Sequence, residues 1–144
     1  MCSGVTNEKT TVPNFHDGQL LGIIVRDRQC KLFVSDVQGS KYSLVLTDVE
    51  RLRADNFLLG NIILDVTVRR GVRLNEQDIL RVLSLDEGHS GAYRVSIDAI
   101  VDRIANDILC FVQVSSSYGC TFESICADIT ASAVDEDTLA VLGL

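Results

Sequence analysis

The sequence predicts a mainly β fold: an antiparallel β-sandwich or strongly curved sheet of about seven or eight strands with one short capping helix, α+β if the helix is counted. Three observations support this. Short runs alternate between apolar and polar residues, turn residues separate the runs, and the apolar content is rich in Val and Ile. β-branched side chains fit a pleated, half-buried surface better than a helix interior. With 144 residues, 47% of them hydrophobic, the chain can supply the core of one domain.

Three alternating runs near the start of the chain predict a β-meander. They cover residues 19–26, 29–36 and 41–47, with turns at 27–28 and 38–40. We expect Leu32 and Val34 to share one face of the second run, and Leu44 and Leu46 to share one face of the third. The less periodic stretch 48–59 is predicted to be a turn and short helix, or a loop that closes one end of the sheet.

Four more strands and one helix are predicted further along the chain. The strands cover residues 62–68, 93–99, 108–115 and 121–133, and the last has a phase slip near 123–125 that is typical of a bulge. In the first of these, Ile62 and Leu64 are expected on the same face, with Ile63 on the polar one. The helix is expected over 75–85, because Asn75 can cap it and acidic residues follow in its first turn. The tail, 135–144, is expected to form one helical turn.

Residues 1–13 are predicted to be a flexible lead-in and residues 14–144 a single β-rich domain. The opening residues lack the apolar stretch of a secretion signal, and no apolar run approaches the roughly 20 residues that span a bilayer. We therefore expect a soluble, cytoplasmic protein that does not engage a membrane. The net charge of −7 argues against binding to nucleic acid, which requires a basic surface.

The five cysteines form an odd set without a CxxC motif, which favours reduced thiols and agrees with a cytoplasmic location. Cys110 and Cys126 lie in apolar runs and are expected to be buried. Cys120 is expected to be the most exposed, but no basic residue lies close to it in sequence to activate the thiol. Cys120 and Cys126 lie too far apart along one strand to form a disulfide bridge.

Two short motifs have a distinctive order in the chain. Phe15-His16-Asp17 precedes the first alternating strand, and Ser117-Tyr118-Gly119 precedes the last. This order resembles a loose group of small bacterial proteins, here called the FHD…SYG group, which includes immunity proteins of polymorphic toxin systems. The resemblance implies a β-rich, non-catalytic protein that inhibits a partner. The chain departs from the group pattern at Gly18, where an acidic or small residue commonly follows, and in its few aromatic residues.

His16 and Asp17 are the sharpest local feature for chemistry. A His beside a carboxylate can act as a general base or as a pair of metal ligands, here with Asp65 and His89 as further ligands. The alternative, which we favour, is that they satisfy backbone groups where the chain enters its first strand. The GxSxG, GxGxxG, P-loop and HExxH motifs are all absent from the sequence. We therefore predict no catalytic residue, no metal site and no cofactor.

Two further features are open to two interpretations each. Arg69, Arg70 and Arg73 can bind a carboxylate or phosphate group, or they can form a solvated loop balanced by acidic neighbours. Residues 56–59 are either an exposed apolar anchor for a partner or a loop that faces the core.

The sequence favours a non-catalytic binding or inhibitory module, immunity-like, that binds a protein partner. The candidate binding residues are His16, Asp17, Asp65, Arg69, Arg70 and Tyr118. One alternative is a small metal-dependent hydrolase that uses His16 and Asp17. Another is a structural domain that self-associates, as a homodimer, through exposed strand edges.

Overall fold

The computed structural model describes residues 13–85 and 94–142, and this part of the chain is mainly β. Eight antiparallel strands form one sheet in the order β4-β7-β6-β5-β1-β2-β3-β8. Their bounds are Gln19–Arg26 (β1), Gln29–Ser35 (β2), Lys41–Thr47 (β3), Arg51–Asp55 (β4), Asn61–Arg69 (β5), Cys110–Tyr118 (β6), Thr121–Cys126 (β7) and Asp128–Ala133 (β8). The predicted fold class is confirmed, and so are the three strands of the predicted meander.

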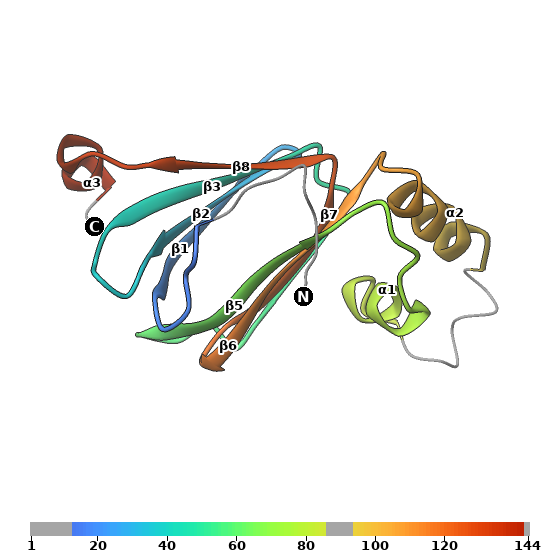
Figure 1. The fold of residues 1–144 in the computed structure, drawn as a ribbon, viewed down its shortest axis with the longest axis horizontal. Helices are drawn as coiled ribbons and strands as arrows, with labels where there is room; N and C mark the ends of the chain where they lie inside the picture. The colour runs from blue at the N-terminus through green and yellow to red at the C-terminus, as the bar shows by residue number, and fades with distance from the viewer. Residues whose placement is uncertain (1–12, 86–93, 143–144) are drawn as a thin grey trace.

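The sheet curls until its two ends meet in one bent ribbon. β3 leads into β4 and β7 leads into β8, so that β3 pairs with β8 and β4 pairs with β7 along the same two segments. Two backbone hydrogen bonds keep the segments paired through the bend: Glu50 N–H donates to Ile125 O over 2.8 Å, and Ala127 N–H donates to Thr47 O over 2.9 Å. Figure 1 shows the result, with β2, β3 and β8 in one layer and β5 and β6 in the other.

On the other side β1 joins the two layers over a short stretch. It pairs with β2 along its length but with β5 only at Gln19 and Leu20. Just before β1, Asp17 N–H donates to Ile63 O and Ile63 N–H donates to Gly18 O, both over 2.9 Å. The far half of β1 therefore extends past β5, bonded to β2 alone.

Apolar side chains from both layers fill the space between them. Leu32 and Val34 from one layer and Val112 and Val114 from the other are fully buried in this first core. Phe15 packs edge-on against Tyr42, with ring centroids 5.4 Å apart. Every second residue along a strand points to the same side of the sheet, which is why the strands present one apolar face to this core. The predicted shared faces in β2 and β3 are confirmed.

Helices α1 (Glu76–Val82) and α2 (Arg94–Ala105) build a second core on the outer face of β6 and β7. Phe111 and Ile125 point away from the first core and pack with helix residues that include Ile79 and Ile104. Figure 1 shows the two helices together at one end of the molecule. β7 is thus covered on both faces, and its residues from Phe122 to Cys126 are all buried. The break in apolar–polar alternation near residues 123–125, which was predicted to be a bulge, arises because both faces of β7 are buried.

The strand predicted over 93–99 is wrong. Residues 94–105 form α2, and Tyr93 lies outside the described residues. The buried side chains of α2 are Ile97, Val101 and Ile104, a spacing of four and three that is characteristic of one helix face. Val95, which lies within the predicted strand, is 84% exposed.

The helix predicted over 75–85 is confirmed as α1. Asn75 caps it, because its Oδ1 accepts a hydrogen bond of 2.7 Å from Gln77 N–H. The stretch 48–59 was predicted wrongly, since it contains β4, which pairs with β7 from Arg51 opposite Ile125 to Asp55 opposite Thr121.

Two details of the later strands also differ from the prediction. In β5, Ile63 is buried and Leu64 is 46% exposed, because register shifts on either side of Ile63 turn it into the first core. The single strand predicted over 121–133 is divided at Ala127 into β7 and β8. Helix α3 (Glu136–Leu142) follows and is longer than the single turn expected.

Asn61 ties the loop before β5 to the turn between β6 and β7. Its buried Oδ1 accepts hydrogen bonds from Leu58 N–H (2.8 Å) and Cys120 N–H (3.0 Å), and its Nδ2 donates to Leu58 O (2.7 Å). The turn itself is made by Gly119, whose φ is +86°. One amide side chain therefore satisfies backbone groups of two loops.

Candidate functional site

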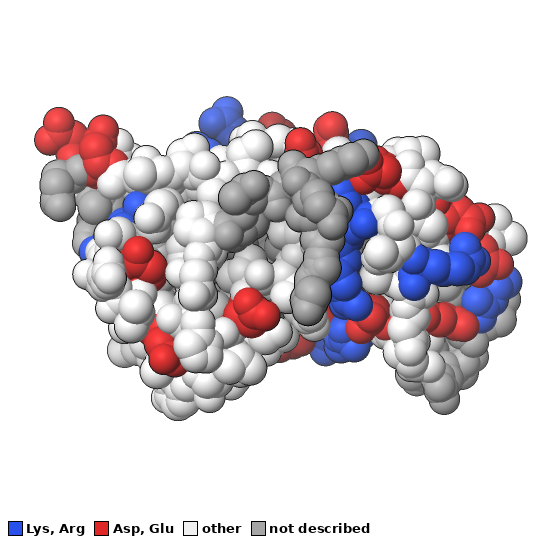
Figure 2. All heavy atoms as spheres, viewed as in Figure 1, with Lys and Arg blue, Asp and Glu red and all other residues white. Residues whose placement is uncertain are grey.

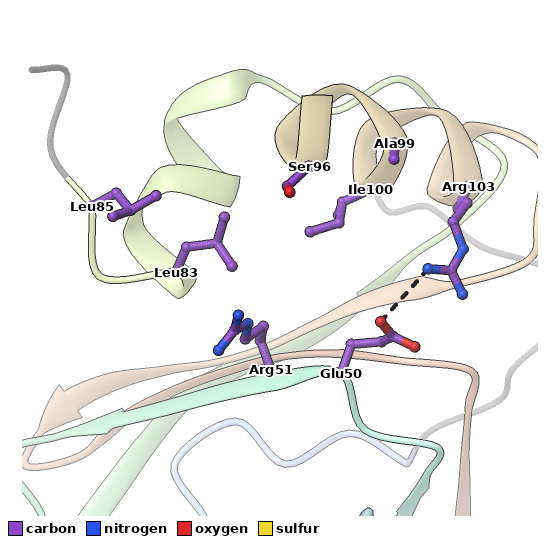
Figure 3. Close-up of a pocket in the computed structure, with 8 residues that line it drawn as sticks. All are labelled: Glu50, Arg51, Leu83, Leu85, Ser96, Ala99, Ile100 and Arg103. Carbon is purple, nitrogen blue, oxygen red and sulfur yellow. Dashed lines mark ion pairs between the residues drawn. The ribbon is translucent and has the colours of Figure 1, made fainter. Parts of the chain in front are cut away.

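A groove of about 530 Å³ lies between the two helices and the start of β4 (Figure 3). It is lined by Glu50, Arg51, Leu83, Leu85, Ser96, Ala99, Ile100 and Arg103. Figure 3 shows Leu83 and Ile100 pointing into the space from the helix side, with Arg51 and Glu50 facing them from the strand side. The groove therefore has an apolar wall opposite a charged one.

The lining of the groove as a whole carries more positive than negative charge. Glu50 Oε2 accepts a hydrogen bond of 2.9 Å from Arg28 Nη2, and Glu50 Oε1 lies 3.6 Å from Arg103 Nη1. Arg51 is exposed and forms no ion pair with any residue that the structure describes. The lining thus holds two guanidinium groups, those of Arg51 and Arg103, and one carboxylate, although the chain as a whole has a net charge of −7.

Lys and Arg side chains also gather on a larger scale. In the face shown in Figure 2 they form a band between the strand layers and the helices, while acidic side chains are scattered over the rest of the surface. A local excess of positive charge in an acidic protein favours an anionic group on whatever binds there.

Backbone and side-chain contacts fix the strand that carries the charged wall. Ser124 Oγ–H donates to Arg51 O over 2.9 Å, from a serine that is fully buried. Arg53 Nη1 donates to Arg81 O over 2.9 Å and so joins β4 to the end of α1. The strand side and the helix side of the groove are therefore held at a fixed separation.

A buried ion pair anchors α1 to the sheet. The Glu123 side chain is 3% exposed and accepts hydrogen bonds from Arg81 Nε (2.7 Å) and Nη2 (2.5 Å) and from Gln113 Nε2 (2.8 Å). Arg81 also donates to Asp78 over 2.7 Å. The hydrogen bonds to Glu123 raise the pKa of Arg81. This cluster positions α1, and with it Leu83 and Leu85 at the rim of the groove.

The six residues predicted to bind a partner are not brought into one site. His16 and Asp17 lie where the chain enters β1, with His16 Nε2 3.6 Å from Asp17 Oδ2 and His16 Nδ1 2.7 Å from Leu64 O. Both are exposed, and their contacts with β5 fit the structural role that was favoured for them. Asp65 is exposed in β5, opposite Ser115.

Tyr118 and the two arginines lie at opposite ends of β5. Tyr118 pairs with Ile62, seven residues before Arg69, which is roughly 23 Å along a strand. Arg69 lies over the Phe111 ring, 4.9 Å from its centroid. Arg70 is 10% exposed and donates to Ala127 O over 2.8 Å, so it is not part of a solvated loop. Arg73 is exposed and pairs with Asp102 over 2.9 Å.

Of the metal site considered for His16, Asp17, Asp65 and His89, only the first three residues lie in the described part of the chain. Within residues 13–85 and 94–142, no group of three or more His, Cys, Asp or Glu side chains is placed to hold a metal ion. His89 itself lies outside the described residues.

Cys120 was expected to be the most exposed cysteine, and this is wrong. It is 1% exposed, because it packs within the first core, and burial raises the pKa of its thiol. The apolar loop 56–59 was left open between two interpretations, and the structure shows it exposed: Phe57, Leu58 and Leu59 are 48%, 38% and 97% exposed.

The groove was not predicted, and the reason is physical. Glu50 and Arg51 fall in a stretch predicted as a turn and short helix or a loop, and Ser96 and Ala99 of its α2 side fall in a stretch predicted as a strand. If residues 94–105 are assigned to a helix, the lining residues Ser96, Ala99, Ile100 and Arg103 fall at helical intervals. This spacing is the feature of the sequence that could have indicated the α2 side of the groove.

No family model, no curated protein and no solved structure matches this chain. None of the helices in the described part combines the length and apolar character that crossing a bilayer requires.

Proposed function

We propose that the chain is a protein-binding module whose docking site is the groove between α1, α2 and β4. The observation that carries the proposal is the guanidinium of Arg51, which has no ion pair among the described residues and faces the apolar side chains of Leu83 and Ile100. The partner segment that fits this groove presents a carboxylate to Arg51 and an apolar side chain to the opposite wall.

The charge balance of the groove supports this choice of partner. Glu50 is already engaged by Arg28 and Arg103, so Arg51 is the cation that remains for an incoming acid. An arginine can hold a carboxylate through two parallel hydrogen bonds, which fixes the direction of the bound segment as well as its charge. The adjoining apolar wall adds contact area without further charge.

The resemblance to the FHD…SYG group adds an inhibitory role to this proposal. Immunity proteins work by occupying a surface of a partner, and a fixed groove supports that kind of binding. The predicted site residues around His16 and Tyr118 lie outside the groove, so the proposal rests on Arg51, Leu83 and Ile100 instead.

The test is selection from a random peptide library displayed on phage, with the purified chain as bait. We expect the enriched peptides to share an Asp or Glu next to Leu, Ile or Phe. Arg51→Glu reverses the charge of the wall, and we expect it to weaken binding of a selected synthetic peptide at least tenfold, as measured by isothermal titration calorimetry.

Lys31→Glu is the matched control. It makes the same change in net charge, but Lys31 lies on β2 and lines a different, shallow hollow with Phe33 and Thr138. We expect the control to bind the peptide as the unmodified chain does. Selected peptides that lack the acidic and apolar pair, or that bind the Arg51→Glu variant with unchanged affinity, would refute the proposal.

A further inference from the structure

Two thiols lie in contact across adjacent strands. Cys110 and Cys126 stand directly opposite each other in the pairing of β6 with β7, and their Sγ atoms are 3.6 Å apart. An S–S bond is about 2.05 Å long. The two sulfur atoms, now 3.6 Å apart, therefore need to move only about 1.5 Å closer together for the bond to form. Cys30 and Cys120 are also buried but have no comparable thiol neighbour among the described residues.

A buried arginine lies beside this pair. The Arg70 side chain is 10% exposed, and its Nη2 donates to Ala127 O, the residue directly after Cys126. Its Nε is buried and donates to no acceptor in the part of the chain that the structure describes. Asp128 Oδ1 lies 3.5 Å from Nη2, and Asp107 Oδ1 lies 3.6 Å from Nη1. A guanidinium group is thus held against the dithiol by contacts on several sides.

The two thiols differ in acidity. The hydrogen bond from Cys126 and the adjacent Arg70 guanidinium lower the pKa of Cys110 to about 7, against the opposing effect of burial. The contact with Cys110 and burial raise the pKa of Cys126. Cys110, whose pKa is lowered, is the thiol better suited to attack, and Cys126 lies in contact with it, where it can resolve the product.

We infer that Cys110 and Cys126 form a site at which a hydroperoxide, of the class of hydrogen peroxide, is reduced and a disulfide is made. The Cys110 thiolate attacks one peroxide oxygen, the O–O bond breaks, and the departing hydroxide takes up the thiol proton as water. Cys126 then attacks the resulting sulfenic sulfur of Cys110, the S–O bond breaks, the S–S bond forms, and the hydroxide leaves with the Cys126 proton as a second water. Two thiols are oxidised and one peroxide is reduced to two waters.

Burial selects the oxidant. Both cysteines are completely inaccessible to solvent, so a bulky disulfide such as oxidised glutathione is excluded. Hydrogen peroxide is uncharged and close to water in size, and the Arg70 side chain that acts on Cys110 is itself only 10% exposed. The reaction therefore favours the smallest hydroperoxides.

The experiment treats the native chain with hydrogen peroxide, blocks the remaining thiols by alkylation after denaturation, and maps the peptides by mass spectrometry. We expect a cross-linked peptide that contains Cys110 and Cys126 and is lighter by two hydrogens. Cys30 and Cys120 serve as internal controls, since both are buried, and we expect them to be alkylated. In Cys126→Ser, which keeps a hydrogen-bonding group beside Cys110 but cannot form the disulfide, we expect the sulfenic acid at Cys110 to be trapped by dimedone added together with the denaturant.

Arg70→Gln tests the role of the guanidinium, with Arg69→Gln as the matched loss of one charge. We expect Arg70→Gln to slow disulfide formation at pH 7 about fivefold, because raising the Cys110 pKa from about 7 to about 8 lowers the thiolate fraction from about one half to about one tenth, and Arg69→Gln to leave the rate unchanged. Circular dichroism checks that both variants are folded. If the native chain keeps Cys110 and Cys126 reduced while Cys30 or Cys120 is oxidised, or yields scrambled disulfides, the inference is wrong. If Arg70→Gln and Arg69→Gln form the disulfide at equal rates, Arg70 has no part in the reaction.

Discussion

At the scale of single residues, the buried carboxylate of Glu123 shows how a charge is tolerated inside this molecule. It lies on the outer face of β7 beneath α1, where three hydrogen bonds from Arg81 and Gln113 replace water. Burying a charge is costly unless it is paired and hydrogen-bonded, so the site stabilises the native state only while both partners are present. The pair specifies where α1 docks more than it strengthens the fold.

Removing both partners of this pair is predicted to destabilise the protein less than the sum of the two single removals. Arg81→Met leaves Glu123 buried with only Gln113, and we expect a loss of about 2 kcal/mol, below the full penalty for a broken buried pair because Arg81 is 40% exposed. The double variant Arg81→Met, Glu123→Leu is expected to recover at least about 1 kcal/mol relative to the sum of the two single changes. Urea denaturation measures all four proteins. Strictly additive losses would contradict this account of the pair.

At the scale of elements, the turn between β6 and β7 depends on Gly119 for two separate reasons. Its φ of +86° is favourable only for glycine, and a Cβ there would lie 2.4 Å from Asn61 Oδ1. Asn61 cannot move aside without losing its bonds to Leu58 and Cys120. Backbone conformation and packing therefore act on the same residue.

Two glycine substitutions separate these contributions. Gly39 has a φ of +89° but nothing within 4 Å of an added Cβ, so Gly39→Ala is expected to cost about 1 kcal/mol from backbone strain alone. Gly119→Ala adds the clash with Asn61, and we expect a loss of about 3 kcal/mol. Thermal and urea unfolding of both variants provide the comparison. Equal losses would show that Asn61 is not held in place as described.

Elements with a strict period were predictable from the sequence, and elements whose surroundings decide their structure were not. β2, β3 and α1 carry clear apolar periods or a capping residue, and their predictions are confirmed. β4 contains two arginines and an aspartate in five residues, and only pairing with β7 makes it a strand. In α2 the alternation of Val95 and Ile97 is compatible with a strand, while the helical spacing becomes clear only at Val101 and Ile104. The groove was missed because it lies between these last two elements.

At the scale of the whole molecule, β6 and β7 are shared by two cores. Their inner side chains belong to the core between the layers, and Phe111 and Ile125 belong to the core under the helices. Local opening of these strands would expose both cores at once, whereas β8 and the far half of β1 are bonded to one neighbouring strand only. Stability is therefore expected to be uneven across the sheet.

Amide hydrogen exchange measures this unevenness residue by residue. We expect the bonded amides of β6 and β7 between Cys110 and Val114, and between Phe122 and Cys126, to exchange most slowly, at the rate set by global unfolding. Amides of β8 and of Ile23–Arg26 are expected to exchange at least about tenfold faster, because their strands can separate from the sheet without opening the helical core. Arg81→Met loosens α1 and should accelerate exchange in β7 before it affects β2. If β8 is protected as strongly as β6, the bent ribbon unfolds as one unit with the rest of the sheet, and the two cores do not divide the molecule energetically.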